Sequence, residues 1–288
     1  MVSATAPVGA PTTTSPSHVP ARRPGGPVRW IRVHLVQIAA GAALFYMFLP
    51  VLVVVAFSFN KPLGKDNTVW RTFSFDAWTN FCGVSGMCDS LRLSLIIGVV
   101  ATLTSVVLGT MVAFAISRHR FVGRASSNLL IFMPMATPEV VMGSSLLTLF
   151  VNMGLHLGPL TIFIAHVMFC LSFVVVTVKA RLAGLDPRLE QAAMDLYADE
   201  KTTFRKITFP LVLPGIVGAS LLAFSLSFDD YIVTAFNSGS EVTFPIFVWS
   251  QARIGAPPQM NVVGALMFFV ALLIVIIAQL VASRRRRV

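Results

Sequence analysis

Charged residues are confined to short stretches of the chain, and long apolar runs lie between them. The runs without Lys, Arg, Asp or Glu are 33–60, 93–117, 140–178, 207–228 and 254–283. Roughly 20 apolar residues cross a bilayer core, so each run is long enough, and a turn-forming composition at 152–159 divides the longest into two. The pattern predicts an all-α polytopic membrane protein with six transmembrane helices, at about 33–58, 93–117, 128–151, 159–178, 211–230 and 261–282.

Composition and charge support this class and suggest an orientation. Of the 288 residues, 56% are hydrophobic and 12% are charged, about half the charged fraction of a soluble domain. The net charge of +10 would suit nucleic acid, but 17 basic residues lie on the side of the two termini and 5 on the other. The positive-inside rule therefore predicts cytoplasmic termini in a multi-pass protein of the cytoplasmic membrane, with no nucleic-acid partner.

The first 30 residues differ from the rest. They contain six prolines among Ala, Thr, Ser and Gly, and such a segment cannot bury enough apolar surface to offset the entropy of ordering. Residues 1–30 are predicted to be a disordered cytoplasmic tail, without the basic start and apolar core of a signal peptide. Residues 31–288 form the membrane domain.

Three cysteines are present. Cys170 lies within the fourth predicted span and is interpreted as a small buried apolar residue. Cys82 and Cys88 share the predicted outer loop 59–92 with two glycines between them, so a disulfide is predicted in that oxidising compartment, with two free thiols as the alternative. No further ligand lies nearby, so a metal site is not expected.

The sequence contains no phosphate-binding loop and no group of residues typical of a catalytic triad. Five scattered histidines are interpreted as structural or interfacial: His18, His34, His119, His156 and His166. The chain therefore shows no catalytic chemistry of its own, and we expect that it is not an enzyme and binds no cofactor.

The predicted cytoplasmic loop 179–210 has the composition of an ordered segment. Asp186 followed by Pro187 is a typical helix start. An apolar stripe at helical spacing follows, made of Leu189, Ala192, Ala193 and Leu196. Asp199 is suited to begin a second short helix that runs toward Pro210. Two short helices suit a docking element, and a helix pair resting on lipid headgroups is the alternative.

This loop resembles the EAA loop of ABC importer permeases. The matching residues are Glu190–Ala198 (Glu-Gln-Ala-Ala-Met-Asp-Leu-Tyr-Ala) and Phe204–Leu211 (Phe-Arg-Lys-Ile-Thr-Phe-Pro-Leu). In that family the loop docks into a cleft of the ATP-hydrolysing subunit, which binds ATP and Mg and whose closure the loop transmits. The resemblance implies an ATPase-coupling role for Glu190, Gln191, Ala192, Ala193, Asp195, Leu196, Tyr197, Ala198 and Pro210. The acids are expected to meet basic groups of the ATPase, and the alanines to keep the docking face thin.

The loop departs from the family pattern at three positions. Gln191 stands where glutamate is usual, Tyr197 replaces a glycine, and Phe209 replaces a leucine. Glycine would suit a left-handed turn between the two helices. Tyrosine in that conformation costs about 1 kcal/mol, or else the turn is built differently.

A larger part of the chain resembles the second permease of spermidine/putrescine importers, through the stretches 133–143, 173–178, 225–231 and 244–261. This resemblance implies import of polyamines. The implied partners are a second homologous permease, two copies of an ATP-binding subunit and an extracytoplasmic substrate-binding protein. Related branches that carry iron, opine-like amino acids or phosphonate remain alternatives. An ATP-independent channel or secondary transporter would leave the EAA-like loop unexplained.

One acidic residue, Glu139, lies deep in a predicted span. An ionised carboxylate near the bilayer centre costs roughly 2.5–3.5 kcal/mol, so it should face a cavity or a partner. Pro134 and Pro138 each remove a backbone hydrogen bond, and a broken helix beside a carboxylate suits the lining of a substrate path. The alternatives are a buried structural hydrogen bond and a pair with the partner permease.

Asp229, Asp230 and Tyr231 close the fifth predicted span at its outer, wetter end. The two carboxylates would attract a diamine or triamine, and Tyr231 would offer a cation–π surface. Adjacent residues on a helix point in different directions, so the alternative for one aspartate is a structural cap for the segment 237–239. Glu241 and Arg253 are better suited to docking of the substrate receptor.

Overall fold

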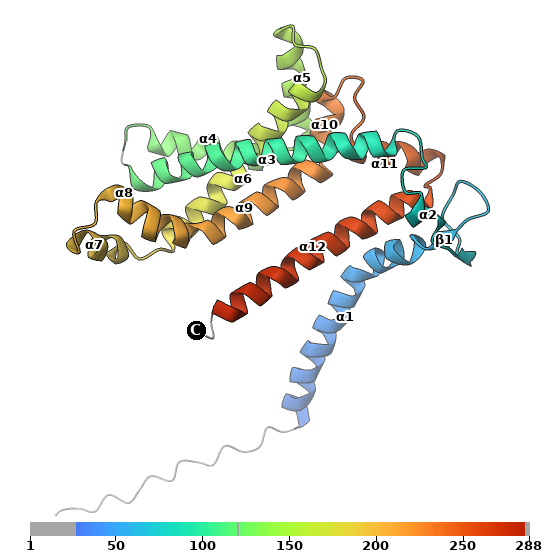
Figure 1. Ribbon diagram of the computed structural model, residues 1–288, viewed down its shortest axis with the longest axis horizontal. Coiled ribbons are helices and arrows are strands. Elements are labelled where there is room, and N and C mark those ends of the chain that lie inside the picture. Colours follow the sequence, from blue (N-terminus) through green and yellow to red (C-terminus); the bar gives the residue numbers. More distant parts are fainter. Residues whose placement is uncertain (1–26, 120, 286–288) are drawn as a thin grey trace, which may run out of the picture. The chain divides into compact units, whose positions relative to one another are not determined.

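The computed structural model describes residues 27–119 and 121–285, most of which are helical (Figure 1). The helices are α1 (Pro27–Phe57), α2 (Asp76–Thr79), α3 (Met87–Arg118), α4 (Arg124–Ala136), α5 (Glu139–Asn152), α6 (Pro159–Ala183), α7 (Arg188–Asp195), α8 (Glu200–Thr203), the π-helical turn η1 (Phe204–Thr208), α9 (Phe209–Asp229), α10 (Ile232–Asn237), α11 (Phe244–Ile254) and α12 (Pro258–Arg285). The two-residue strands β1 (Asn60–Lys61) and β2 (Thr72–Phe73) pair antiparallel. The predicted tail falls mainly on residues 1–26, outside the described part, and α1 already begins at Pro27.

Five helical segments are long and apolar enough to cross a membrane, and a bent pair would make a sixth. The five are His34–Phe57, Met87–Arg118, Pro159–Ala183, Glu200–Asp229 and Pro258–Ile277. The predicted span 128–151 is not one continuous helix: α4 and α5 meet at an angle of 107°. Thr137 has extended backbone angles because proline disfavours a helical conformation in the residue before it, so Pro138 separates the two helices.

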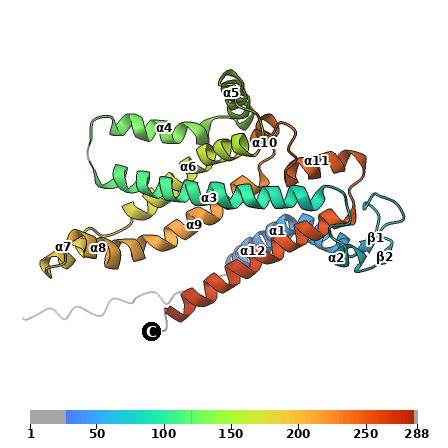
Figure 2. The ribbon, with the colours of Figure 1, turned by 45° about the horizontal axis from the view of Figure 1, so that its top comes forward.

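The chain divides into two compact units, one ending at Val53 and one beginning at Val54. The described side chains of α1 in the first unit are largely exposed, as suits a helix whose surroundings are apolar. In the second unit, α3, α6 and α9 run side by side (Figures 1 and 2).

The core of the second unit is centred on α6. Cys170, Val174 and Val178 of this helix are fully buried. Small residues let the neighbouring helices approach closely: a methyl group on Gly109 of α3 would lie 2.7 Å from Val174. As predicted, Cys170 is a buried free thiol within the core.

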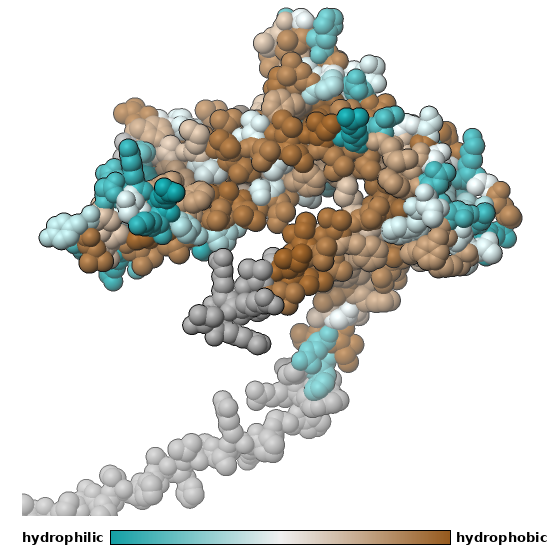
Figure 3. All heavy atoms as spheres, in the orientation of Figure 1, coloured by the Kyte–Doolittle hydropathy of each residue, from teal (hydrophilic) through white to brown (hydrophobic). Residues whose placement is uncertain are grey.

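Apolar and polar surfaces separate along the second unit. Figure 3 shows hydrophilic residues gathered around α7 and α8 and around the segment with β1, with mostly hydrophobic surface over the helices between them. An apolar band between two polar ends is the distribution expected for a chain that spans a bilayer.

The loop between α1 and α3 is fastened by polar contacts and a disulfide. The buried side chain of Asn60 donates to the Asn67 side chain at 2.6 Å and to the Val69 carbonyl oxygen at 2.9 Å. A disulfide joins Cys82 and Cys88, whose Cα atoms are 5.5 Å apart. The disulfide ties the first turn of α3, which contains Cys88, to this loop.

Oxidation of this cysteine pair can be measured directly. We expect the mature protein to add one alkyl group, at Cys170, when it is denatured and alkylated without reductant, and three after reduction. Intact-mass analysis distinguishes the two results. Alkylation of Cys82 and Cys88 without reductant would show that the thiols are free.

Candidate functional site

Two regions collect the residues predicted to be functional: the loop containing α7, and a cavity beside the start of α5. Helix α7 begins at Arg188, one residue after the predicted start at Pro187, and the Asp186 carboxylate accepts a hydrogen bond from the Arg188 backbone N–H at 2.9 Å. Asp199 is the N-cap residue of α8. The π-helical turn η1 then leads into α9, and Pro210 lies in the first turn of that helix.

Tyr197 has a left-handed backbone conformation, with φ of 61°, and is the only non-glycine residue with positive φ in the described part of the chain. Its N–H donates to the Met194 carbonyl oxygen at 3.0 Å, and the Ala198 N–H donates to the Ala193 carbonyl oxygen at 3.1 Å. This pair of bonds is the Schellman motif that glycine usually completes. The chain therefore makes the family's turn with a tyrosine, at a cost of about 1 kcal/mol.

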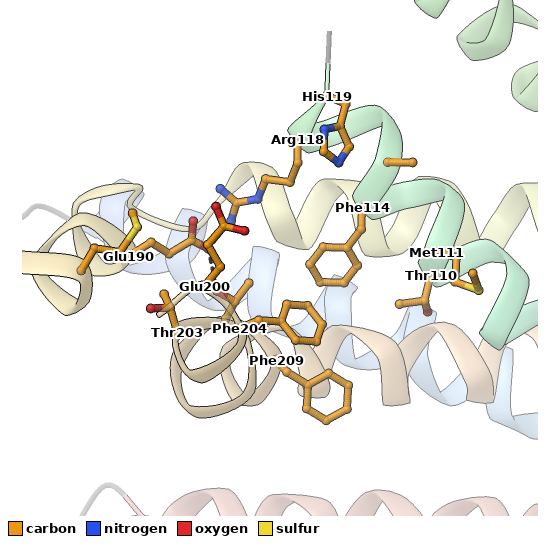
Figure 4. A pocket seen from close by; sticks show the side chains of 13 residues that line it. Thr110, Met111, Phe114, Arg118, His119, Glu190, Glu200, Thr203, Phe204 and Phe209 are labelled. Atoms are coloured by element: carbon orange, nitrogen blue, oxygen red, sulfur yellow. Dashed lines mark hydrogen bonds and ion pairs between the residues drawn. The ribbon is translucent and has the colours of Figure 1, made fainter. Parts of the chain in front are cut away.

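Glu190 of α7 contacts two other elements, α3 and η1. One oxygen of its carboxylate forms an ion pair with Arg118 at the end of α3 and accepts a hydrogen bond of 2.7 Å from the Thr208 hydroxyl in η1. Figure 4 shows the Arg118 side chain reaching toward Glu190 across a cavity of about 700 Å³. Glu190 thus contacts its own chain, although the resemblance suggested that it meets basic groups of the ATPase.

Aromatic residues line the same cavity. The Phe114 ring of α3 lies 5.4 Å from that of Phe204, which lies 6.1 Å from that of Phe209. Phe209, the residue that replaces leucine, is therefore part of this aromatic group. A movement of α7 or η1 would be transmitted to α3 by both the ion pair and these rings.

The other predicted coupling residues divide between the interior and the surface. Ala193 is buried, whereas Gln191, Ala192 and Asp195 are exposed. Leu196 is 81% exposed and Tyr197 is fully exposed, while Ala198 is half-buried. Of the predicted apolar stripe, Ala193 is buried, whereas Leu189, Ala192 and Leu196 are exposed.

The second region is a cavity of about 670 Å³ that brings together all four predicted path residues, Glu139, Asp229, Asp230 and Tyr231. The remaining lining is apolar or aromatic: Phe169, Leu226, Phe228, Ile232, Phe244, Pro245, Val248, Trp249 and Ala252. None of these described lining residues is lysine or arginine. A cavity with several carboxylates and no basic wall favours a cationic occupant.

The carboxylate of Asp230 is used by its own chain. It is 4% exposed and accepts hydrogen bonds of 2.7 Å from both the backbone N–H and the hydroxyl of Thr234. His166 lies 3.4 Å away and is held by Ser227 and Thr234 at 2.7 and 2.9 Å. Asp230 therefore has a structural capping role, but it caps the start of α10 and not the predicted segment 237–239, and it is not at a wet end of the span.

Glu139 and Asp229 supply the open carboxylates of the cavity, since both residues are exposed. Glu139 is the first residue of α5, so the helix dipole stabilises its negative charge. Tyr231 and Trp249 stand with ring centres 5.2 Å apart, and Arg253 lies over Trp249 at 5.1 Å. The break in the predicted third span thus places the Glu139 carboxylate in the wall of a cavity that also has aromatic residues.

Several residues of these regions were not predicted. Arg118 was counted only toward membrane orientation, His166 was treated as a scattered histidine, and Trp249 was not singled out. The aromatic stretch Phe244–Trp249 was a usable signal for the cavity wall. No signal in the sequence pairs Arg118 with Glu190 or His166 with Asp230, because the partners lie more than 60 residues apart.

Residues 105–288 match the protein family described as the binding-protein-dependent transport system inner membrane component. This segment includes both the α7 loop and the cavity. The chain belongs to this family. Its fold and its apolar helices accordingly make it a multi-pass membrane protein that serves as a transport subunit.

Full-length relatives are similar over most of the chain. The spermidine/putrescine transport system permease protein PotC of Haemophilus influenzae is 35% identical, over 83% of this chain and 93% of the relative. PotC of Escherichia coli K12 is 34% identical, over 84% and 91%. The putrescine transport system permease protein PotI of Escherichia coli K12 is 37% identical, over 77% and 81%.

Solved ABC transporters share the fold at low identity. A chain of a bacterial ABC transporter involved in import of the acidic polysaccharide alginate superposes with a TM-score of 0.62 at 16% identity, over 90% of this chain and 98% of that one. A chain of the MetNI methionine ABC transporter in an inward-facing conformation gives 0.55 at 16% identity, over 69% and 95%. The arrangement of helices is thus shared with chains of solved ABC transporters.

Proposed function

We propose that this chain is a permease subunit of an ATP-driven importer that carries polyamines such as spermidine and putrescine across the cytoplasmic membrane. The observation that supports the cargo best is the cavity formed by Glu139, Asp229, Tyr231 and Trp249. Its carboxylates and rings suit linear ammonium ions. The relatives named for spermidine and putrescine support the same cargo. A phosphonate would meet carboxylates and no described basic residue in that cavity.

The proposed topology has six spans, with α4 and α5 together forming the third, and both termini in the cytoplasm. The excess of basic residues on that side supports the orientation. The α7 loop then lies in the cytoplasm, where an ATP-binding subunit can reach it, and the loop between α1 and α3 lies outside.

The proposed complex contains a second homologous permease, two ATP-binding subunits and an extracytoplasmic substrate-binding protein, and this chain contacts membrane lipid. ATP and Mg bind to the ATP-binding subunits. Their closure moves α7, the Glu190 contacts pass the movement to α3 and η1, and access to the cavity changes from one side of the membrane to the other. The receptor releases its ligand into the cavity at that stage.

Uptake by the reconstituted complex tests the cargo and the path. We expect ATP-dependent uptake of radiolabelled spermidine or putrescine, and Glu139→Gln should lower it about 10-fold. A charge pair 4 Å apart is worth about 4 kcal/mol at an effective dielectric of 20 before desolvation, and about 1.4 kcal/mol corresponds to a tenfold change in rate. Asp229→Asn should also lower uptake, because Asp229 is the other exposed carboxylate of the cavity.

The controls separate a path residue from a structural one. Co-purification of all subunits with the Glu139→Gln chain shows whether the complex assembles. Wild-type uptake velocity at all substrate concentrations would exclude Glu139 from the path. Loss of assembly would place Glu139 at the interface with the second permease. Uptake without ATP would contradict the importer class.

A further inference from the structure

The turn between α7 and α8 presents two adjacent apolar side chains outward. The Tyr197 side chain is fully exposed and that of Leu196 is 81% exposed. They follow Ala193, through which α7 packs against the rest of the loop. The turn therefore projects an apolar knob, made of Leu196 and Tyr197, away from its own chain.

The backbone makes tyrosine a disfavoured residue at this position. With φ of 61°, Tyr197 completes the Schellman motif of α7, and glycine would make the same hydrogen bonds without the clash of a Cβ atom. Strained residues persist where something else requires the side chain. The exposed ring stabilises nothing in its own chain that would offset the strain, so the gain lies in a contact with another molecule.

We propose that the Leu196–Tyr197 knob inserts into an apolar recess with a basic rim on the ATP-binding subunit, and that Tyr197 selects the matching subunit among related ones. The inference rests on the proposed function, because it takes the α7 loop as the docking element. It adds a specific anchor residue, at the position where this chain departs from the glycine of its family.

Charge around the knob favours a protein partner over the membrane surface. Asp195, Asp199 and Glu200 lie within three positions of Tyr197 in the sequence, and Lys201 is the one basic residue within five positions of it. The Thr202 side chain lowers the pKa of Asp199 by hydrogen bonding, which keeps that carboxylate ionised. An anionic lipid surface would repel these acids, whereas a basic rim would attract them.

Tyrosine is suited to such an anchor. Its large ring has few rotatable bonds, so little conformational entropy is lost when it is immobilised, and tyrosines are frequent among the residues that dominate interfaces. A recess shaped for this ring would bind a loop with glycine at the same position less tightly.

Two measurements on one variant should change in opposite directions. In the full permease heterodimer in nanodiscs, Tyr197→Gly is expected to raise the melting temperature of the permeases by about 2 °C, because the strain is removed. Titration with the purified ATP-binding subunit of the same importer should give a Kd about 10-fold higher than for the wild type. Tyr197→Phe keeps the ring and should leave both values near wild type.

Each alternative result has a distinct meaning. A Kd that Tyr197→Gly leaves unchanged overturns the proposal, and so does a lower melting temperature together with weaker binding, which would assign Tyr197 a structural role. An effect present in nanodiscs of anionic lipid and absent in detergent would assign the ring to lipid headgroups and overturn it as well. A wild-type heterodimer that binds no ATP-binding subunit contradicts the proposed function itself, whatever the variants do.

Discussion

Glu190→Arg is expected to lower ATP-driven uptake by about 10- to 100-fold while the complex still assembles. The substitution removes the ion pair to Arg118 and the hydrogen bond from Thr208, and it brings two guanidinium groups together. Hydrogen bonds to charged groups contribute about 1.5–3 kcal/mol, and partial exposure of both side chains reduces that value. The α7 helix would lose its direct link to α3, so ATP hydrolysis would continue with little transport.

The measurement is the number of substrate molecules imported per ATP hydrolysed in proteoliposomes. The reversed pair Glu190→Arg with Arg118→Glu should recover part of the lost coupling, because the attraction is restored. His119→Gln is the control: it changes a polar side chain in the wall of the same cavity without touching the ion pair. Wild-type coupling in Glu190→Arg would show that the contact is not needed, and a reversed pair no better than the single variant would assign the defect to another cause.

Most of the observed helices were predicted from the hydrophobic runs and from the resemblance of the loop. The apolar segments correspond to observed helices because a bilayer demands continuous apolar length, a local property of the sequence. The 107° bend between α4 and α5 was not predicted, although Pro134 and Pro138 indicated a weakened helix. A proline removes a hydrogen bond locally, but the direction of the next helix depends on α5 packing against α10, which is far along the chain.

Among the functional residues too, features set by neighbouring residues were predicted, and contacts between residues far apart in the chain were not. Comparison with the family pattern predicted that Tyr197 either adopts a left-handed turn or changes it, and the structure has the left-handed turn. The roles of Glu190 and Asp230 were less accessible, because each is set by a partner in another helix. The sequence does not show which way a carboxylate side chain points. The packing of α9 against α6 brings His166 beside Asp230.

Asp230→Ala is expected to destabilise the permease strongly, whereas Asp229→Ala should leave its stability almost unchanged. The Asp230 side chain is buried, and it accepts hydrogen bonds from Thr234 and lies 3.4 Å from His166. Its removal leaves the Thr234 N–H and hydroxyl without this acceptor, and a buried donor left unsatisfied costs about 1–3 kcal/mol. Asp229 is exposed to the cavity and no described hydrogen bond or ion pair fastens its side chain.

Thermal unfolding of the two purified variants in detergent compares neighbouring residues of identical chemistry. Asp229→Ala should lower polyamine uptake at an unchanged melting temperature, and Asp230→Ala should lower the melting temperature or prevent accumulation of folded protein. Asp230→Asn, which retains an acceptor oxygen, should fall between wild type and Asp230→Ala in stability. Equal melting temperatures for the two alanine variants would show that the Asp230–Thr234–His166 contacts do not stabilise the junction of α9 and α10.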